Sequence, residues 1–510
     1  MRSVRGLPEL RVEVDGTPLA PEELRALESV RVQQHLSLPA LCELTFTDPR
    51  GALATRGLPP GTALRVSVAA RREPLFVGEV TAVEYVHGAS GTRQVRVRSY
   101  DLLHRLRKRQ PVRVHAQVTP RDLARELVSD LGLSVEASEP GPLSHHLIQH
   151  GQSDLEFLVE QTERCGLWLV LEEGVLRVLS LGGHGDPIPL VMGESLLEAC
   201  VEVNGDPACR SVSSAGWNAL QGQVYTASPS GGRVSRRVEA SVPPERVGGS
   251  GERALVNENA EDTAHAEALA LAELDHRLAR EVVLTGVAEG DPRLRPGTRV
   301  DVRGVVPVVA GQYVLTAVTH TLDAQHGFLS ELSSSPPPRR TRPRASSVVP
   351  GVVSRVDDPD NKGRVRVSLP TCGDVETDWM QVLCAGAGAG KGLVMLPDVG
   401  DTVLLVLSGE DPARGVVVGG LYGANGPPDT GVSGAAVRRF NLLTPGGSSC
   451  ASTTRRRRSG SRTSSAATCN CLPMSSACMP RRRSRSRPPA NPSRSKPPPS
   501  ISGGGTECVG

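Results

Sequence analysis

A glycine-rich stretch at residues 385–392, AGAGAGKG, is the first candidate for chemistry because it looks like a phosphate-binding loop. Such a loop needs a glycine five positions before the Gly-Lys pair and a serine or threonine after the lysine, which binds Mg²⁺. Here Ala385 holds the first position and Gly392 follows Lys391. The sequence therefore predicts an ordinary connection between two strands and no nucleotide site.

Histidines gather at one place, where His145 and His146 lie close to His150. Metal sites add cysteine or carboxylate ligands at fixed spacing on a defined scaffold, and none stands at that spacing here. We expect an exposed loop in this Pro/Gly-rich connection. By the same reasoning His184-Gly185-Asp186 is expected to be a turn.

Glu156 and Glu160 lie one helical turn apart, as paired catalytic carboxylates of a glycosidase could. Ser153 three residues before Glu156 forms a capping-box pattern, which explains the first glutamate, and solvation explains the second. The chain has no HExxH zinc motif and no GxSxG nucleophile elbow. We therefore expect no enzyme, and no catalytic, cofactor-binding or metal-binding residues.

The cysteines show neither metal-ligand spacing nor a dense disulfide pattern in the first 449 residues, so buried reduced thiols are expected there, with disulfides or metal as the alternatives. The body cysteines are Cys42, Cys165, Cys200, Cys209, Cys372 and Cys384. Near the C-terminus, Cys469, Cys471 and Cys478 imitate a metal cluster but lack a fourth ligand.

Strands and a few helices must position these groups. Alternation of apolar and polar residues predicts strands at 10–14, 64–68, 76–80 and 95–100. Thr119-Pro120 begins one helix and Ser153 a second, which leads into a hairpin at 167–178. Further strands are expected within 195–245, a helix at 261–280, and strands at 281–287, 298–303 and 312–321. A Pro-rich linker follows at 333–347.

Charge is distributed unevenly along the chain. Residues 450–510 hold 12 Lys/Arg and one acid, a balance of +11, so the net charge of +3 leaves −8 for the preceding residues. The body is therefore not an evident nucleic-acid binder. The sequence has no apolar run long enough to span a membrane and no signal-peptide core at its start, so cytoplasmic synthesis without classical export is expected.

Residues 351–428 resemble the OB-fold barrel of the VgrG and phage baseplate spike family. The resemblance is carried by Asp357-Asp358-Pro359-Asp360, Gly363-Arg364-Val365, Asp378-Trp379, and the segments 396–401 and 416–422. Residues 153–178 also resemble the hub part of that family. Within the barrel, Asp378-Trp379 is interpreted as core packing at a strand edge, with oligonucleotide or sugar binding as the alternative.

The resemblance implies a mainly β fold with a few helices. It divides the chain into a hub-like domain with two β-barrel subdomains (1–332), a linker (333–347), an OB-fold spike barrel (348–430), the start of a needle (431–449) and a basic tail (450–510). It implies a homotrimeric spike hub that caps the inner tube of a contractile injection apparatus and helps to puncture the target envelope. The implied partners are tube and baseplate proteins, a PAAR-like tip protein, effector cargo and the target membrane. The particle would be released or secreted.

The tail has two interpretations. As written it is Arg/Ser/Pro-rich and would be disordered. If the frame has slipped, reading across the codon boundaries of 472–503 permits a peptide with alternating runs such as Val-Glu-Ile-Glu, which resembles the β-helical needle of the family. The rival function is an OB-fold nucleic-acid-binding protein whose basic tail is genuine.

Overall fold

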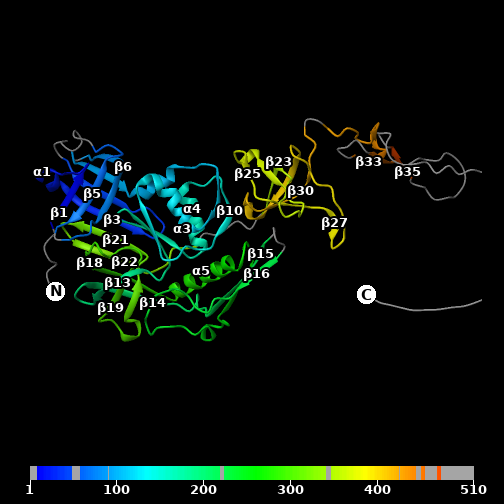
Figure 1. Cartoon of the computed structure of the whole chain (residues 1–510). Helices are drawn as coiled ribbons and strands as arrows, with labels where there is room; N and C mark the ends of the chain where they lie inside the picture. Colours follow the sequence, from blue (N-terminus) through cyan, green and yellow to red (C-terminus); the bar gives the residue numbers. More distant parts are fainter. Residues whose placement is uncertain are drawn as a thin grey trace, which may run out of the picture. The chain divides into compact units, whose positions relative to one another are not determined.

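The computed structural model describes residues 9–48, 58–69, 71–89, 91–218, 223–339, 346–423, 426–443, 449–453 and 468–472. The chain forms two compact units, Met1–Leu421 and Tyr422–Gly510. Strands predominate and helices are few, so the predicted mainly β fold is confirmed (Figure 1). Among the described residues, no helix is both long and apolar enough to span a membrane.

One 11-stranded sheet forms the frame of the hub, in the order β14-β18-β22-β21-β3-β4-β7-β6-β5-β1-β2. Its strands are β1 (Leu10–Val14), β2 (Thr17–Pro18), β3 (Leu27–His35), β4 (Leu41–Thr47), β5 (Ala63–Val68), β6 (Phe76–His87), β7 (Arg93–Tyr100), β14 (Leu196–Val203), β18 (Val282–Glu289), β21 (Ala317–Asp323) and β22 (Gly327–Ser333). The expected strands at 10–14, 64–68, 76–80 and 95–100 are all present. A short helix, α1 (Pro21–Arg25), precedes β3.

Two separate apolar cores lie along this sheet. The first gathers the N-terminal strands and includes Phe46, and the second gathers the strands around Tyr313. Strand β21 joins them, because Leu322 packs in the first core and Val318 in the second. It does so by pairing with β3 from residue 317 to 323. The two expected β-subdomains therefore share one continuous sheet.

A helical lobe interrupts the hub. Thr119 caps α3 (Pro120–Val128), Ser153 and Glu156 form a capping box on α4 (Asp154–Arg164), and both helices begin as predicted. The lobe also contains η1 (Leu102–Lys108), η2 (Ser129–Leu131), β8 (Arg113–Val118), β9 (Ser134–Ala137), β10 (Ser144–Gln149), β11 (Trp168–Glu172) and β12 (Val175–Leu179). β11 and β12 are the predicted hairpin.

Helix α5 (Thr263–Glu281) packs on a three-stranded sheet of β16 (Gln223–Ala227), β15 (Ser211–Asn218) and β17 (Glu252–Glu258). Another sheet consists of β13 (His184–Val191), β19 (Thr298–Arg303) and β20 (Gly311–Val314). The hub also contains η3 (Pro244–Val247) and η4 (Pro307–Val309).

The single strand expected at 312–321 is wrong, because β20 and β21 belong to different sheets. The chain breaks at Leu315, which is fully buried, and at Thr316, whose hydroxyl donates to the carbonyls of Ser333 and Ser335.

The first half of the predicted linker is attached to the hub instead of acting as a free spacer. The Ser334 hydroxyl accepts the N–H of Leu284 at 2.8 Å, and the carbonyl of Pro337 lies 3.1 Å from Nε2 of His276. Arg339 forms an ion pair with Glu273 on α5. Residues 340–345 lie outside the described residues.

The OB barrel is a six-stranded sheet in the order β25-β24-β23-β29-β30-β26. A bridge between Val365 and Met380 closes it. Its apolar core includes Val353, Val367 and Leu405. Its elements are β23 (Ser347–Arg355), β24 (Arg366–Leu369), η5 (Pro370–Cys372), β25 (Val375–Glu376), β26 (Gln381–Val382), β27 (Ala385–Gly388), β28 (Lys391–Leu393), β29 (Thr402–Leu407), η6 (Ser408–Glu410) and β30 (Gly415–Gly420).

The second unit contains short strands. They are β31 (Val432–Ser433), β32 (Ala436–Val437), β33 (Arg439–Leu443), β34 (Ser449–Thr453) and β35 (Thr468–Leu472), and the last three form one sheet. The tail was expected to lack regular structure from residue 450 onward. Strands β34 and β35 lie almost wholly within this tail and pair with each other, so the expectation is wrong for these residues. Residues 473–510 lie outside the described residues, so for them disorder stays a prediction.

Candidate assembly surface

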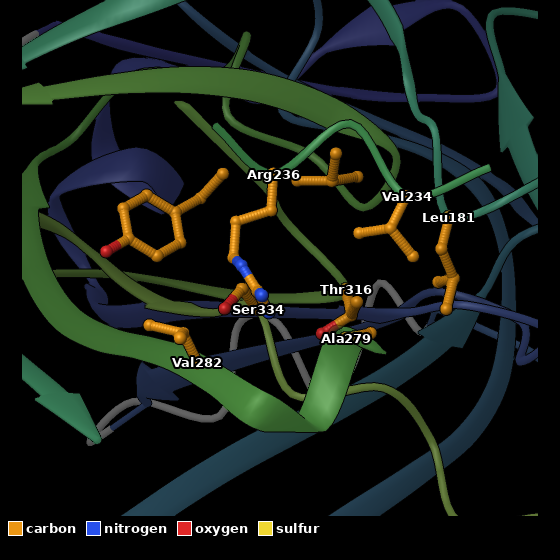
Figure 2. Close-up of a pocket in the computed structure, with 9 residues that line it drawn as sticks. Leu181, Val234, Arg236, Ala279, Val282, Thr316 and Ser334 are labelled. Atoms are coloured by element: carbon orange, nitrogen blue, oxygen red, sulfur yellow. The ribbon is translucent and has the colours of Figure 1, made fainter. Parts of the chain in front are cut away.

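A small internal cavity lies in the hub near the start of β18 (Figure 2). Its volume is about 20 Å³, enough for about one water molecule. The polar side chains on its wall already have partners: Arg236 pairs with Glu281 at 2.9 Å, and Thr316 and Ser334 bond to backbone groups. The remaining wall residues are Leu181, Val234, Ala279, Val282, Tyr313 and Val314. This cavity is an internal packing feature and cannot hold a substrate.

The glycine-rich stretch was expected to be a loop between two strands, but it itself forms two short strands of an antiparallel hairpin. β27 pairs with β28, and Gly388 lies opposite Lys391. Gly390 in the turn has a φ of +68°, a conformation that glycine adopts without strain. Strand β29, and not a helix, is the next element after β28, and a phosphate loop needs a helix directly after it, since helical backbone N–H groups hold the anion.

Of the three histidines expected in a loop, His145 and His146 lie in a strand, so the expectation is wrong for them, whereas His150 follows the end of that strand. His145 and His146 belong to β10, which pairs with β8. No strand pattern marks this segment because Ile148 and Gln149 are both buried, which breaks the alternation. In the described part of the chain no group of three or more His, Cys, Asp or Glu side chains could hold a metal.

The other candidate polar groups have structural partners. Glu156 accepts the N–H of Ser153 at 2.9 Å, as the capping box requires. Glu160 was expected to be only solvated, but its carboxylate accepts a hydrogen bond from the side chain of Gln152 at 3.2 Å. His184 begins strand β13 instead of a turn, and its Nε2 lies 3.3 Å from Glu172, so the expected turn at 184–186 is also wrong.

Trp379 is the only aromatic residue between positions 347 and 420. It is buried, and the guanidinium groups of Arg355 and Arg366 lie 5.5 Å and 5.1 Å from the centre of its ring. Asp378 accepts the N–H of Trp379 at 2.7 Å. Core packing, the predicted role, is therefore observed. A single-strand binding platform requires exposed aromatic rings on which bases stack, so the nucleic-acid alternative is not favoured.

The six body cysteines are free, as expected, but only three of them are buried. Cys42, Cys165 and Cys209 lie in the interior, Cys372 and Cys384 are half-buried, and Cys200 is exposed. Burial raises the pKa of the Cys42 thiol well above its usual range, which makes that thiol a poor nucleophile. The side chains of Cys469 and Cys471, and all of Cys478, lie outside the described residues.

Residues 383–399 of the OB barrel carry six exposed apolar side chains, which we call the 383–399 surface. Each of its six members is between 44% and 69% exposed. They are Leu383, Leu393, Val394, Met395, Leu396 and Val399. Figure 1 shows the chain near β27 projecting from the barrel strands β23, β25 and β30. Large exposed apolar groups close together in sequence mark a contact site for another protein surface.

A pattern in the sequence marks this surface. The run at 393–397, LVMLP, is apolar yet lies between a glycine hairpin and a turn. It has no alternation, so it is not the half-buried strand of a single barrel.

Two family profiles match this chain. Residues 7–324, more than half of the chain, match the Alg8 N-terminal domain. Residues 349–422 match the type VI secretion system/phage-baseplate injector OB domain. The second match confirms the resemblance of the barrel to the VgrG and phage baseplate spike family. No curated protein matches the sequence.

A search of solved structures found matches of low sequence identity, one of them with a TM-score above 0.5. The E. coli c3393 protein, described as a component of the type VI secretion system similar to T4 tail proteins gp27 and gp5, is 14% identical, with a TM-score of 0.53 over 81% of this chain and 99% of that chain. The lidded Francisella PdpA-VgrG complex is 8% identical, with a TM-score of 0.49 over 90% and 78%. The prophage MuSo2 43 kDa tail protein from Shewanella oneidensis is 13% identical, with a TM-score of 0.48 over 64% and 97%.

Proposed function

We propose that this chain, which belongs to the family of the Alg8 N-terminal domain, acts as the trimeric spike hub of a contractile, phage-tail-like injection apparatus. It is a structural protein of the spike-hub type, with an injector OB domain that follows a mainly β hub. The observation that carries the proposal is the hub sheet, in which one chain holds two apolar cores side by side on a single 11-stranded sheet.

Two β-subdomains per chain would allow a threefold spike to match a sixfold tube. A spike built from three chains must sit on a tube of sixfold symmetry, and a trimer of two-subdomain chains presents six similar platforms. The shared sheet supports this role, because β21 fixes the two subdomains against each other. Three chains would thereby cap the inner tube and contact the baseplate.

The 383–399 surface is the proposed contact between the three OB barrels. Exposure of its six apolar side chains to water is unfavourable. Burying them against a second copy of the chain would stabilise the complex by about 25 cal/mol per Å² of apolar surface. In the proposed particle the barrels continue into the needle that begins at 431–449, which would carry a PAAR-like tip and effector cargo and help to puncture the target envelope. The basic tail is then a needle read out of frame.

Light scattering of the full chain tests the trimer. The chain as written should associate weakly into a trimer whose fraction rises with concentration. Val394→Ser combined with Met395→Ser should shift it to monomer, because both side chains lie on the surface. The matched control is Val306→Ser, a hub residue that is 66% exposed, and it should leave the mass unchanged.

Two outcomes would reject parts of this proposal separately. A monomer at every concentration of the unmodified chain would reject the trimer. An unchanged trimer in the double variant would reject the 383–399 surface and leave the trimer standing.

A further inference from the structure

The OB barrel is attached to the hub by contacts within the first compact unit, and a histidine lies at three of them. Ile148 of β10 packs in the core of the barrel. His146 lies on the same strand, His265 is in the first turn of α5, and His276 is further along that helix. These three side chains are buried or half-buried.

His146 sits directly against the barrel. Its ring lies beside the backbone of Glu376 in β25, and its buried Nε2 has no hydrogen-bond partner among the described residues. It lines a cavity of about 500 Å³, together with Val114, Ala116, Gln117, His145, Arg366, Glu376 and Asp378. The charges that face it are the carboxylates of Asp378 and Asp411 and the guanidinium of Arg366.

His265 lies beside the ion pair that joins the barrel to the hub. Its Nδ1 is 3.0 Å from Asp262, and its Nε2 is 3.3 Å from the hydroxyl of Ser144 in β10. The neighbouring Glu261 forms an ion pair with Arg414 of the barrel at 3.0 Å, and it also accepts the N–H of His145 at 2.9 Å. Glu261, Asp262 and Arg414 are the charges that face this ring.

His276 holds the linker between hub and barrel. Its Nε2 lies 3.1 Å from the carbonyl of Pro337. The charges around it are Arg339, Glu273 and Arg280, of which Arg339 and Glu273 pair with each other. The segment leading into the barrel is thereby fixed along α5.

Each of these attachments involves a histidine, whose ordinary pKa is about 6.5, whereas carboxylates and guanidinium groups ordinarily keep their charge between pH 5 and 7. We propose that the joint between the hub and the OB barrel is an acid-sensitive latch, closed at neutral pH and opened when His146, His265 and His276 take up protons.

Burial supports this direction. It lowers the pKa of all three histidines from the ordinary value of 6.5. Nearby carboxylates oppose this only in part for His146 and His265, as do the Pro337 carbonyl and Glu273 for His276. The closed joint therefore binds fewer protons than the open one, and its stability rises with pH. The stabilisation is present above pH 6.5 and is lost as the pH falls through the lowered values. For each pH unit within that window, each histidine lowers the closed-to-open ratio by up to about tenfold.

The test uses the full chain, followed from about pH 7.5 to about pH 5, the range in which histidines titrate. Small-angle scattering, at a concentration where light scattering shows constant mass, should report an increase in radius of gyration as the joint opens. In the variant H146Q/H265Q/H276Q this transition should disappear or move to lower pH, because glutamine does not titrate. The matched control is H326Q, a residue of an exposed turn whose side chain is 63% exposed, and it should keep the transition.

Exchange of the imidazole C2 hydrogens, read by mass spectrometry, supplies a second measurement that needs no variant. It should give pKa values below 6.5 for these three rings in the unmodified chain. Values at or above 6.5 would overturn the latch even if the triple variant fails to fold. An unchanged radius across the pH range, or the same transition in a folded triple variant, would also overturn it.

Discussion

Asp358 should be the most damaging single carboxylate to remove from the OB barrel. Its side chain accepts the backbone N–H groups of Asp360, Lys362 and Arg364 at 3.1, 2.8 and 3.2 Å. The guanidinium of Arg364 adds two further bonds, at 2.6 and 3.1 Å. Only 8% of Asp358 and 7% of Arg364 is exposed. Asp358→Ala would leave a buried guanidinium and three N–H groups without this partner.

Breaking a buried ion pair from one side costs about 3–5 kcal/mol. For a barrel of this size such a loss corresponds to a fall of more than about 10 °C in Tm. Asp358→Asn keeps the shape and one acceptor oxygen, so it should cost less, on the order of 1.5–3 kcal/mol for the charged hydrogen bonds. Differential scanning calorimetry of the full chain measures both losses. The matched control is Asp357→Asn, a neighbouring carboxylate that is 68% exposed and should change Tm little.

The pH dependence follows from the same contacts. The bonds from Arg364 and the backbone hold the pKa of Asp358 below its ordinary value of 3.8. The native state therefore binds this proton less readily than the unfolded state, so the stabilisation is present above pH 3.8 and is lost as the pH falls further. The difference in Tm between the unmodified chain and Asp358→Asn should shrink below pH 4. A loss under about 1 kcal/mol for Asp358→Ala, the size of an exposed pair, would refute the reasoning.

Three further predictions follow. Gly290→Ala should destabilise the hub by about 1–3 kcal/mol, because the new Cβ would lie 2.1 Å from the ring of Phe328, whereas Gly419→Ala has open space and should be neutral in thermal unfolding. The chain should hydrolyse neither ATP nor peptidoglycan, and turnover that Lys391→Ala abolishes would contradict this. Sequencing should find a single-base insertion or deletion near codons 447–455, and restoring the frame should give a heat-resistant trimer by light scattering; a restored chain that stays monomeric would contradict it.

Local signals in the sequence predicted the elements well. The caps at Thr119 and Ser153 fix the starts of two helices because each side chain satisfies an N–H group within its own turn. Strand β19 coincides with the predicted 298–303, because its apolar residues alternate. Such features depend on neighbours a few positions away, which the sequence shows directly.

The expectations that failed depended on distant partners. β20 and β21 were predicted as one strand because no turn residue near Leu315 indicates a break. At this point the chain stops pairing with β19 and begins to pair with β3. The histidines of β10 were expected in a loop because Ile148, on the same hub strand, packs in the core of the distant OB barrel, and the sequence does not show this contact.

The attachment of the OB barrel also depends on residues that are distant in the sequence. For this reason local composition predicted a free linker where the structure has an attached one. A Pro-rich segment between two domains predicts a spacer when composition alone is weighed. In the structure the carbonyl of Pro337 and the charge of Arg339 both meet side chains of α5, which lies some sixty residues earlier in the chain. A spacer held at two points along a helix transmits orientation from the hub to the barrel. In the proposed spike, this attachment would let force applied to the hub reach the barrel without bending at the joint.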